Sequence, residues 1–253
     1  MPSELGDFLR TRRAKVGPED IGLVPGGPRR VTGLRREEVA LAAGVSVDYY
    51  RRLEQGRELR PSPEVLAALS TILHLSEPEQ QYVYSLAGVA RRLDEQASTR
   101  PVPPELLALM DSWQEAGAMV LDPLLDVVVL NSRATELFCG FTETANLLEM
   151  VFLDPEGRRF YVDWEAAAEG TVANLRASAD FSHTPARLTE LLETLNGGSA
   201  EFAAYWSRHD VQPKTHETKL LHHPIRGRLT ADFHAFGVAS APGYQLLIYR
   251  ERS

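Results

Sequence analysis

The stretch that most constrains the fold of this chain is RREEVALAAGVSVDYYRRLEQGR, residues 35–57. Apolar side chains recur at helical spacing on both sides of Gly44, and glycine ends a helix readily because a left-handed backbone carries no Cβ penalty there. Ser46 is placed to cap a second helix. The pattern therefore predicts two short helices, over 36–43 and 47–55, joined by a sharp turn.

The second of these helices has two chemically different faces. Tyr50 and Leu53 fall on one face, which we expect to pack into a core. The opposite face carries Val47, Asp48, Arg51 and Arg52. A helix that enters the major groove of DNA needs this division, with one face anchored and the other free for base edges. The stretch predicts a helix-turn-helix that binds double-stranded DNA. The alternative is a pair of helices that serves only as a protein-interaction module.

Helical patterns continue on both sides of this pair. Helices are predicted over residues 3–15, 61–73 and 76–90, which makes five in about ninety residues. We expect a compact all-α, five-helix helix-turn-helix domain over residues 1–92.

The rest of the chain has a different pattern. Residues 93–104 lose the apolar periodicity and end in prolines, as is typical of a linker. Residues 105–253 then combine two early strands, a helical middle whose last helix is expected to close at Asn196-Gly197-Gly198, and three final antiparallel strands. We expect an α+β sensor domain with a PAS-like fold over this second part.

The charge of the chain is divided between its two ends. The net charge is −8, but residues 1–60 carry 12 basic and 9 acidic side chains, and residues 101–253 carry 12 and 21. This asymmetry favours one end that faces DNA and one that does not. No apolar run reaches membrane-spanning length and the first residues do not form a signal peptide, so we expect a cytoplasmic protein without a membrane partner. The single cysteine, Cys139, is expected in the core beside Phe138 and Phe141.

The first part of the chain resembles a known class of regulators. The helix-turn-helix is similar to the XRE class, and the longer pattern from LGDFLRTRR to PSPEVLAAL, over residues 4–90, resembles regulators of the MmyB-like family. This resemblance implies that Val47, Asp48 and Arg52 read bases, that Arg36 contacts phosphate and base, and that Glu54 forms a buried pair with Arg13. Loop arginines are expected to add backbone contacts. The predicted DNA-contacting residues are Arg29, Arg30, Arg35, Arg36, Ser46, Val47, Asp48, Tyr49, Arg51 and Arg52.

The sequence departs from the wider class at three of these positions. Many relatives carry glutamine where this chain has Arg36, Val47 and Asp48. Arginine favours phosphate or guanine, valine packs on a thymine methyl, and aspartate accepts from a cytosine amine but repels phosphate. The operator sequence therefore does not follow from the resemblance.

The second part resembles a sensor domain. VVVLNSRATELF is similar to the strand-to-helix corner of PAS-like sensors, with Asn131 as the helix cap, and residues 105–250 resemble the ligand-binding domain of the MmyB-like family. The resemblance implies an apolar pocket for a fatty-acyl-like small molecule. The alternative for each aromatic residue is an ordinary core position. The expected lining is Trp113, Val127, Val129, Phe138, Phe152, Trp164, Phe202, Trp206 and Phe233, with His209 and His222 orienting a ligand carboxylate at the mouth.

Six histidines lie in this second part, which raises the alternative of a metal-dependent enzyme. However, His222 and His223 are adjacent in a predicted strand and point to opposite faces, and no HExxH, GxSxG or P-loop pattern occurs. We expect no catalytic residue, no metal site and no obligatory cofactor. The preferred prediction is a homodimeric transcriptional regulator whose DNA binding is modulated by a ligand. A constitutive DNA-binding protein whose second domain only dimerises is the other alternative.

Overall fold

The computed structural model describes residues 3–23, 33–89, 102–179, 186–241 and 243–252. These residues form two compact units, one made of the described residues up to 89 and one made of those from 102 onward. In the described part of the chain, no helix combines the length and the apolar character that crossing a membrane requires.

The first unit is helical, as the sequence predicts. Serine side chains cap several of its helices: Ser3 Oγ accepts from Gly6 N, and Ser46 Oγ accepts from Tyr49 N, both at 3.1 Å. The predicted capping box also forms, with Ser76 N donating to Glu79 Oε2 at 2.7 Å. The described helices of this unit are α1 (Glu4–Lys15), the 3-10 helix η1 (Glu19–Ile21), α2 (Arg36–Ala42), α3 (Val47–Glu54), α4 (Pro63–Ile72) and α5 (Glu77–Leu86).

The core of this unit lies where α1 meets α3 and α5. Phe8 is fully buried and packs edge-on against Tyr82 with ring centroids 5.3 Å apart. Gly6 lets α1 approach α3 closely, because a Cβ at this position would lie 2.6 Å from Glu54 O. Close packing of α1 therefore fixes the position of α3, which carries the predicted base-reading residues.

The second unit is built on one antiparallel sheet of five strands in the order β2-β1-β5-β4-β3. The early pair and the closing three strands agree with the predicted α+β pattern. The register pairs Ala118 with Ile248 and Gly117 with Tyr249, so these two pairs lie on opposite faces. The strands are β1 (Ala116–Leu121), β2 (Val127–Leu130), β3 (His216–His223), β4 (Gly227–Gly237) and β5 (Gln245–Glu251).

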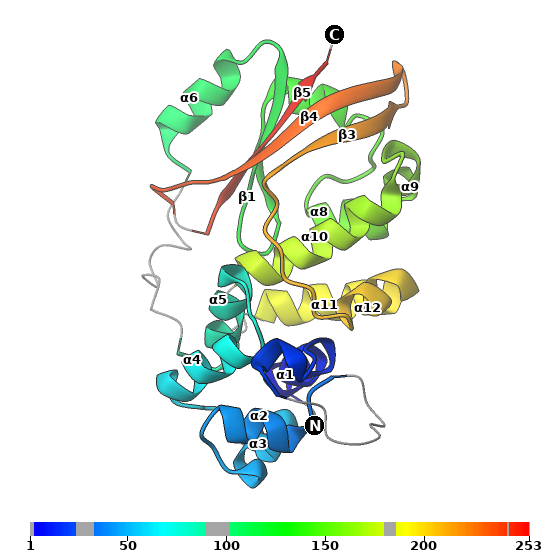
Figure 1. Ribbon diagram of the computed structural model, residues 1–253. Helices are drawn as coiled ribbons and strands as arrows, with labels where there is room; N and C mark the ends of the chain where they lie inside the picture. The colour runs from blue at the N-terminus through cyan, green and yellow to red at the C-terminus, as the bar shows by residue number, and fades with distance from the viewer. Residues whose placement is uncertain (1–2, 24–32, 90–101, 180–185, 242, 253) are drawn as a thin grey trace. The chain divides into compact units, whose positions relative to one another are not determined.

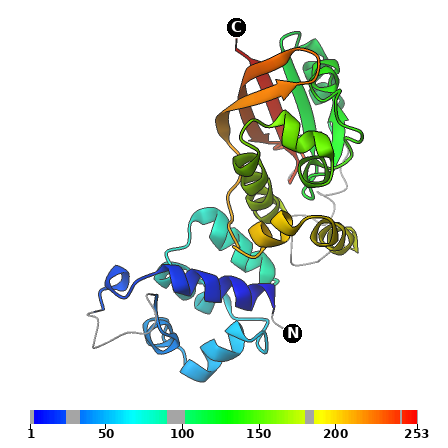
Figure 2. The same cartoon turned by 90° about the vertical axis from the view of Figure 1, so that its right-hand side faces the viewer.

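Helices lie on both sides of this sheet. Helix α6 lies on one side, which we call the outer face, and α8 to α10 lie on the other, the inner face (Figure 1). Helices α11 and α12 lie on the side of α10 that is farther from the sheet, as the turned view shows (Figure 2). The helices are α6 (Pro104–Ser112), α7 (Ser132–Leu137), α8 (Leu147–Phe152), α9 (Pro155–Phe160), α10 (Trp164–Ser178), α11 (Ala186–Gly198) and α12 (Ala200–Trp206).

Each face of the sheet has its own core. On the outer face, Met110 of α6 packs with Ala118 and Val120. On the inner face, Tyr249 meets the rings of Phe138 and Phe233 at centroid distances of 5.4 and 5.0 Å. The strand alternation decides which residues belong to which core.

Helix α11 ends at Gly198, the last residue of the predicted Asn196-Gly197-Gly198 stop, although neither glycine adopts a left-handed backbone. Two other features of this unit differ from what the sequence predicts. Helices α9 and α12 were not predicted. Cys139, expected in the core, is exposed just after the end of α7, with its Sγ 3.7 Å from His223 Nε2.

Candidate DNA-reading helix and ligand-binding residues

Helix α3 presents the two faces that the sequence predicts. Tyr50, Leu53 and Glu54 are buried, with exposed fractions of 2% or less. The predicted reading residues Val47, Asp48, Arg51 and Arg52 are exposed. This division leaves one face of a well-anchored helix free for the major groove.

The turn before α3 depends on Gly44. Its φ is +68°, in the left-handed region that favours glycine, and it follows directly on the last turn of α2. Ser46 then begins α3 as its cap. The glycine and the serine together set the angle between the two helices of the predicted helix-turn-helix.

Glu54 ties three parts of the helical unit together. Its Oε1 lies 2.6 Å from Arg13 Nε of α1, and its Oε2 lies 2.6 Å from Arg36 Nε of α2. Burial opposes the charge of Glu54, but the hydrogen bonds from Arg13 and Arg36 outweigh it and hold the pKa of this carboxyl below its ordinary value. The Arg13–Glu54 pair is the one that the family resemblance implies. The second bond, to Arg36, was not predicted.

Asp48 pairs with neighbouring arginines on the exposed face of α3. It forms an ion pair with Arg51, and its Oδ2 lies 3.8 Å from Arg52 Nη1. The guanidinium of Arg52 also lies over the ring of Tyr49, 5.8 Å from its centroid. Asp48 therefore orients two basic side chains in addition to presenting its own carboxylate, which the sequence did not reveal.

The remaining predicted DNA contacts come from the segment before α2. Arg35 is exposed and its backbone N–H donates to Glu38 Oε2 at 2.6 Å, which places it at the cap of α2. The guanidinium of Arg36 is 42% exposed in spite of its bond to Glu54. Arg29 and Arg30 lie outside the described residues.

The predicted ligand-lining residues fall into three places rather than one pocket. Trp113 and Val129 pack on the outer-face core beneath α6. Phe138 and Phe233 lie on the inner face, where both touch Tyr249. The sheet therefore separates these two pairs, since adjacent residues of a strand point to opposite faces. Val127 is half-buried on the edge strand β2.

The third place is an aromatic cluster between α8, α10 and α12. The ring of Phe152 lies 5.6 Å from that of Trp164 and 5.3 Å from that of Phe202. Phe202 in turn stacks on Trp206, which the guanidinium of the buried Arg176 covers at 3.6 Å. These side chains fill the space between three helices, as the alternative of an ordinary core position predicts.

The histidines predicted at a pocket mouth do not share a surface. His209 is buried after α12, where its φ of +53° places it in the left-handed region, whereas His222 is exposed on β3. His223 is buried, so His222 and His223 point to opposite faces as predicted. Among the described residues, no group of three or more His, Cys, Asp or Glu side chains is arranged to hold a metal ion.

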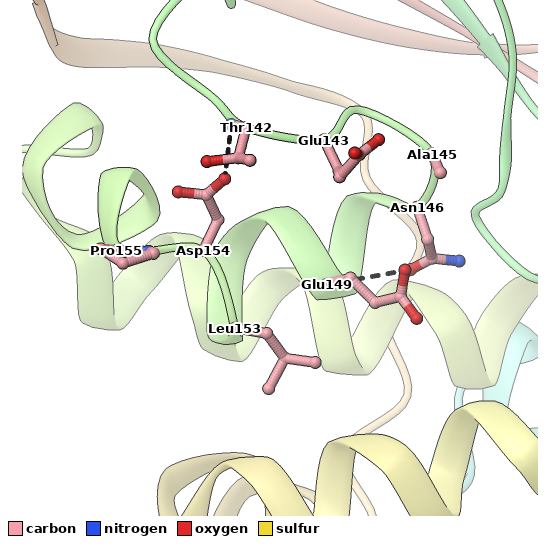
Figure 3. Close-up of a pocket in the computed structure, with 8 residues that line it drawn as sticks. All are labelled: Thr142, Glu143, Ala145, Asn146, Glu149, Leu153, Asp154 and Pro155. Carbon is pink, nitrogen blue, oxygen red and sulfur yellow. Dashed lines mark hydrogen bonds between the residues drawn. The ribbon is translucent and has the colours of Figure 1, made fainter.

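A surface pocket of about 380 Å³ lies where the loop after α7 meets α8 (Figure 3). Its polar side chains already hold the local backbone: Asp154 Oδ2 accepts from Thr142 N at 2.7 Å, and Asn146 Oδ1 accepts from Leu148 N at 2.8 Å. None of the predicted ligand residues lines it. The lining residues are Thr142, Glu143, Ala145, Asn146, Glu149, Leu153, Asp154 and Pro155. With two glutamates and an aspartate, this pocket does not suit an anion.

A polar group on the inner face was not predicted, and it consists of Lys214 and Lys219 with Glu217, Tyr161 and Tyr249. We call these five residues the lysine cluster. A signal was present in the composition, because only three of the chain's 27 basic Lys and Arg residues are lysines. Two of the three, Lys214 and Lys219, lie in this cluster.

The geometry thus defines a class of protein. A helical unit presents an anchored helix with a polar, exposed face, and a separate α+β unit encloses two cores around one sheet. The first arrangement is that of a helix-turn-helix protein.

The two units match two family models. Residues 4–82 match a helix-turn-helix domain, and residues 102–252 match the MmyB-like transcription regulator ligand binding domain. Because the second match covers more than half of the chain, the chain belongs to the family of transcription regulators with an MmyB-like ligand binding domain. A comparison with curated proteins finds no match. The chain is therefore a ligand-responsive, DNA-binding transcription regulator.

Proposed function

We propose that this regulator is an XRE-class homodimer that binds a two-fold operator and releases or engages it in response to a fatty-acyl-like ligand. The observation that carries the proposal is helix α3, whose buried face is locked by Glu54 and whose exposed face carries Val47, Asp48, Arg51 and Arg52. One such helix contacts one half-site, and a second copy doubles the base readout.

In this proposal the exposed residues of α3 contact different groups of the DNA. Val47 packs on a thymine methyl, and Arg52 donates to a guanine or to a phosphate. Asp48 accepts from a cytosine amine while holding Arg51 beside it. Arg35 and Arg36 at the start of α2 contact phosphates, so that binding weakens as salt rises.

The ligand is proposed to enter the α+β unit. The two early strands, the helical middle and the three closing antiparallel strands of this unit support the PAS-like fold. An apolar chain suits the aromatic side chains of the inner face better than the acid-lined pocket at α8. Binding then shifts the population of dimer arrangements and changes the spacing of the two reading helices.

Two other functions remain as outcomes of the test. A constitutive DNA-binding protein would use its second unit only to dimerise, and a metal-dependent enzyme would use it for catalysis. We propose neither a catalytic role nor an obligatory cofactor. The cytoplasmic location likewise stays a prediction.

The test begins with native mass spectrometry of the purified full chain, followed by denaturing extraction and analysis of the released small molecules. We expect a dimer that carries an acyl-chain compound or takes one up. An operator selected from random duplexes is then bound with and without added dodecanoate, at a stated salt concentration. Binding without sequence preference would contradict the DNA-reading role. Sequence-specific binding that no apolar compound alters would favour the constitutive protein, and a stoichiometric metal would favour the enzyme.

A further inference from the structure

The chain uses lysine very sparingly. It has three lysines, and the other basic residues are arginines. Lys15 is exposed at the end of α1, whereas Lys214 and Lys219 lie close together in the α+β unit. Lysine differs from arginine in carrying a compact charge that burial can neutralise. Lys219 is buried and Lys214 is half-buried, so the use of lysine at these two positions calls for a physical reason.

Lys214 lies in the segment that leads into β3 and is held against α10. Its backbone N–H donates to Asn174 Oδ1 at 2.9 Å, and its Nζ donates to Thr171 Oγ1 at 2.9 Å. The same Nζ lies 5.6 Å from the centre of the Phe233 ring. Its direct hydrogen-bond partner on α10 is thus a neutral hydroxyl, so α10 supplies no counter-charge through this contact.

Lys219 enters the same space from β3. Its side chain is 7% exposed, and its Nζ lies 5.1 Å from the Phe233 ring centre and 5.6 Å from that of Tyr161. Its Nζ also lies 2.7 Å from Glu217 Oε1. The carboxylate of Glu217 reaches in from the surface, because its side chain is 47% exposed.

The charges of the lysine cluster do not balance. Two ammonium groups share the ring of Phe233, and Glu217 is the carboxylate that acts on both of them. Tyr161 and Tyr249 add no negative charge, since burial raises the pKa of both hydroxyls. Burying a charge without a partner is costly, so a site with an excess ammonium group favours an added anion.

Tyr249 also leaves hydrogen-bonding capacity unused. Tyr249 is 2% exposed, and its hydroxyl lies near that of Tyr161 without forming a hydrogen bond of good geometry among the described residues. A buried hydroxyl that lacks a well-formed bond costs free energy. An anion placed between the two lysines would offer acceptor oxygens to this hydroxyl as well.

We propose that the lysine cluster binds the anionic head group of the regulator's ligand, and that this head group is a carboxylate. A carboxylate supplies one negative charge and two acceptor oxygens, which match one excess ammonium group and its neighbouring donors. The proposal rests on the proposed function, because it assigns the polar end of the same apolar ligand. It replaces the prediction that His209 and His222 orient this group.

The affinity of such a site for a carboxylate should depend on pH. Burial first, and the neighbouring Lys219 second, lower the pKa of Lys214 to about 7, against the smaller opposing effect of Glu217. A bound carboxylate stabilises the protonated amine and raises this pKa again. Dodecanoate should therefore bind more weakly as the pH rises above 7, with proton uptake on binding. The charged or titratable groups that face Lys214 are Lys219 and Glu217 of β3, Tyr161 after α9 and Tyr249 of β5.

The first experiment compares dodecanoate with dodecan-1-ol, which has the same chain length and no charge, on the full chain. We expect Lys214→Met and Lys219→Met each to weaken dodecanoate binding by roughly tenfold or more, since a charge-assisted hydrogen bond is lost, and to leave dodecan-1-ol binding within about twofold. Lys214→Arg should keep dodecanoate binding but lose its pH dependence, because arginine stays charged. Lys15→Met is the matched control and should change neither affinity.

The second measurement follows the protonation of each lysine side chain directly. With three lysines in the chain, ¹³C-labelled lysine gives three side-chain resonances that can be followed by NMR as the pH is changed. We expect the Lys214 resonance to titrate near pH 7 in the free protein and at clearly higher pH with dodecanoate. A purely structural lysine would titrate at the same pH with and without dodecanoate, and that result would overturn the head-group site.

The outcomes separate this proposal from the proposed function. If dodecanoate and dodecan-1-ol bind equally well and the lysine variants change neither affinity, the proposal of an apolar ligand is supported and the proposed head-group site is wrong. If acetate alone shifts the Lys214 titration and a long chain adds nothing, the anion site stands and the fatty-acyl ligand fails. If neither dodecanoate nor dodecan-1-ol binds and no carboxylate changes the pH at which Lys214 titrates, both proposals are wrong.

Discussion

The two units of the chain treat buried charge in opposite ways. In the helical unit, the buried Glu54 lies between two arginines, and its Oε1 and Oε2 each have a guanidinium nitrogen 2.6 Å away. In the α+β unit, Lys214 and Lys219 face one partly exposed carboxylate, that of Glu217. The buried carboxylate of the helical unit thus has more counter-charges than it needs, whereas the two lysines of the α+β unit have too few.

The difference separates a structural tie from a binding site. A buried ion whose lone pairs are all engaged holds helices in one geometry and gains nothing from a further ligand. A buried ion pair with an excess charge gains from any group that restores the balance. The two units should therefore respond differently to substitution and to pH.

The largest effect is expected at Glu54. Replacing it in the Glu54→Ala variant leaves Arg13 partly buried without its counter-charge, which should cost about 3 kcal/mol of unfolding free energy. Urea unfolding at neutral pH measures the change. The control is Glu37→Ala, an exposed site at the start of α2, which should change stability by no more than about 0.5 kcal/mol. Similar losses for the two variants would mean that Glu54 is not a structural tie.

The next effect concerns DNA binding by the exposed face of α3. Arg52→Ala should weaken binding to the selected operator by about 2 kcal/mol and leave the fold intact, since this side chain is exposed. Fluorescence anisotropy with a labelled duplex measures the affinity. Arg57→Ala, exposed beyond the end of α3, provides the comparison. Equal affinities for wild-type and Arg52→Ala protein would remove Arg52 from the readout.

A smaller effect follows from the lowered pKa of Lys214. The unfolded lysine has a pKa of 10.5 and the folded one about 7, so between these values the unfolded state holds more protons. Stability of the ligand-free protein should therefore rise with pH, by about 1.5 kcal/mol between about pH 7 and about pH 8.5. Urea unfolding of wild-type and Lys214→Met protein isolates this contribution. If both proteins show the same pH dependence, Lys214 keeps its charge at neutral pH.

The smallest effects come from one substitution made in both units. Gly44→Ala should cost about 1 kcal/mol, because its φ of +68° strains any residue with a Cβ. Gly170→Ala in α10 should instead stabilise the protein by about 0.5 kcal/mol, because the added Cβ meets open space and alanine favours a helix. Thermal unfolding resolves the opposite signs. A gain at Gly44 would show that the turn before α3 is not held in its left-handed geometry.

The helix-turn-helix could be predicted because its signals are local. The stop at Gly44, the cap at Ser46 and the helical spacing of Tyr50 and Leu53 all act within about one turn of helix. Each of these predictions is confirmed. The bond between Arg36 and Glu54 joins residues 18 apart, and no local pattern reveals it.

The ligand-lining residues could not be predicted because their grouping depends on long-range pairing. Aromatic identity indicated that Trp113 and Phe138 are interior, but only the register of β1 with β5 decides which side of the sheet each one occupies. Helix α12 was missed for a related reason. Its side chains Phe202 and Trp206 are aromatic, and only the fold shows that they lie on a helix that packs Phe202 against Phe152 of α8.

The bonds that Glu54 forms with Arg13 and Arg36 also limit which positions of this regulator can vary during evolution. Val47, Asp48, Arg51 and Arg52 lie on the exposed face of α3, so replacing them alters base preference without disturbing the core. Arg36 is different, because the same guanidinium faces outward and anchors α2 to α3. A lineage that acquires a new operator can therefore vary the exposed face of α3 without disturbing the core, whereas a change at position 36 also removes one of the two bonds that hold Glu54.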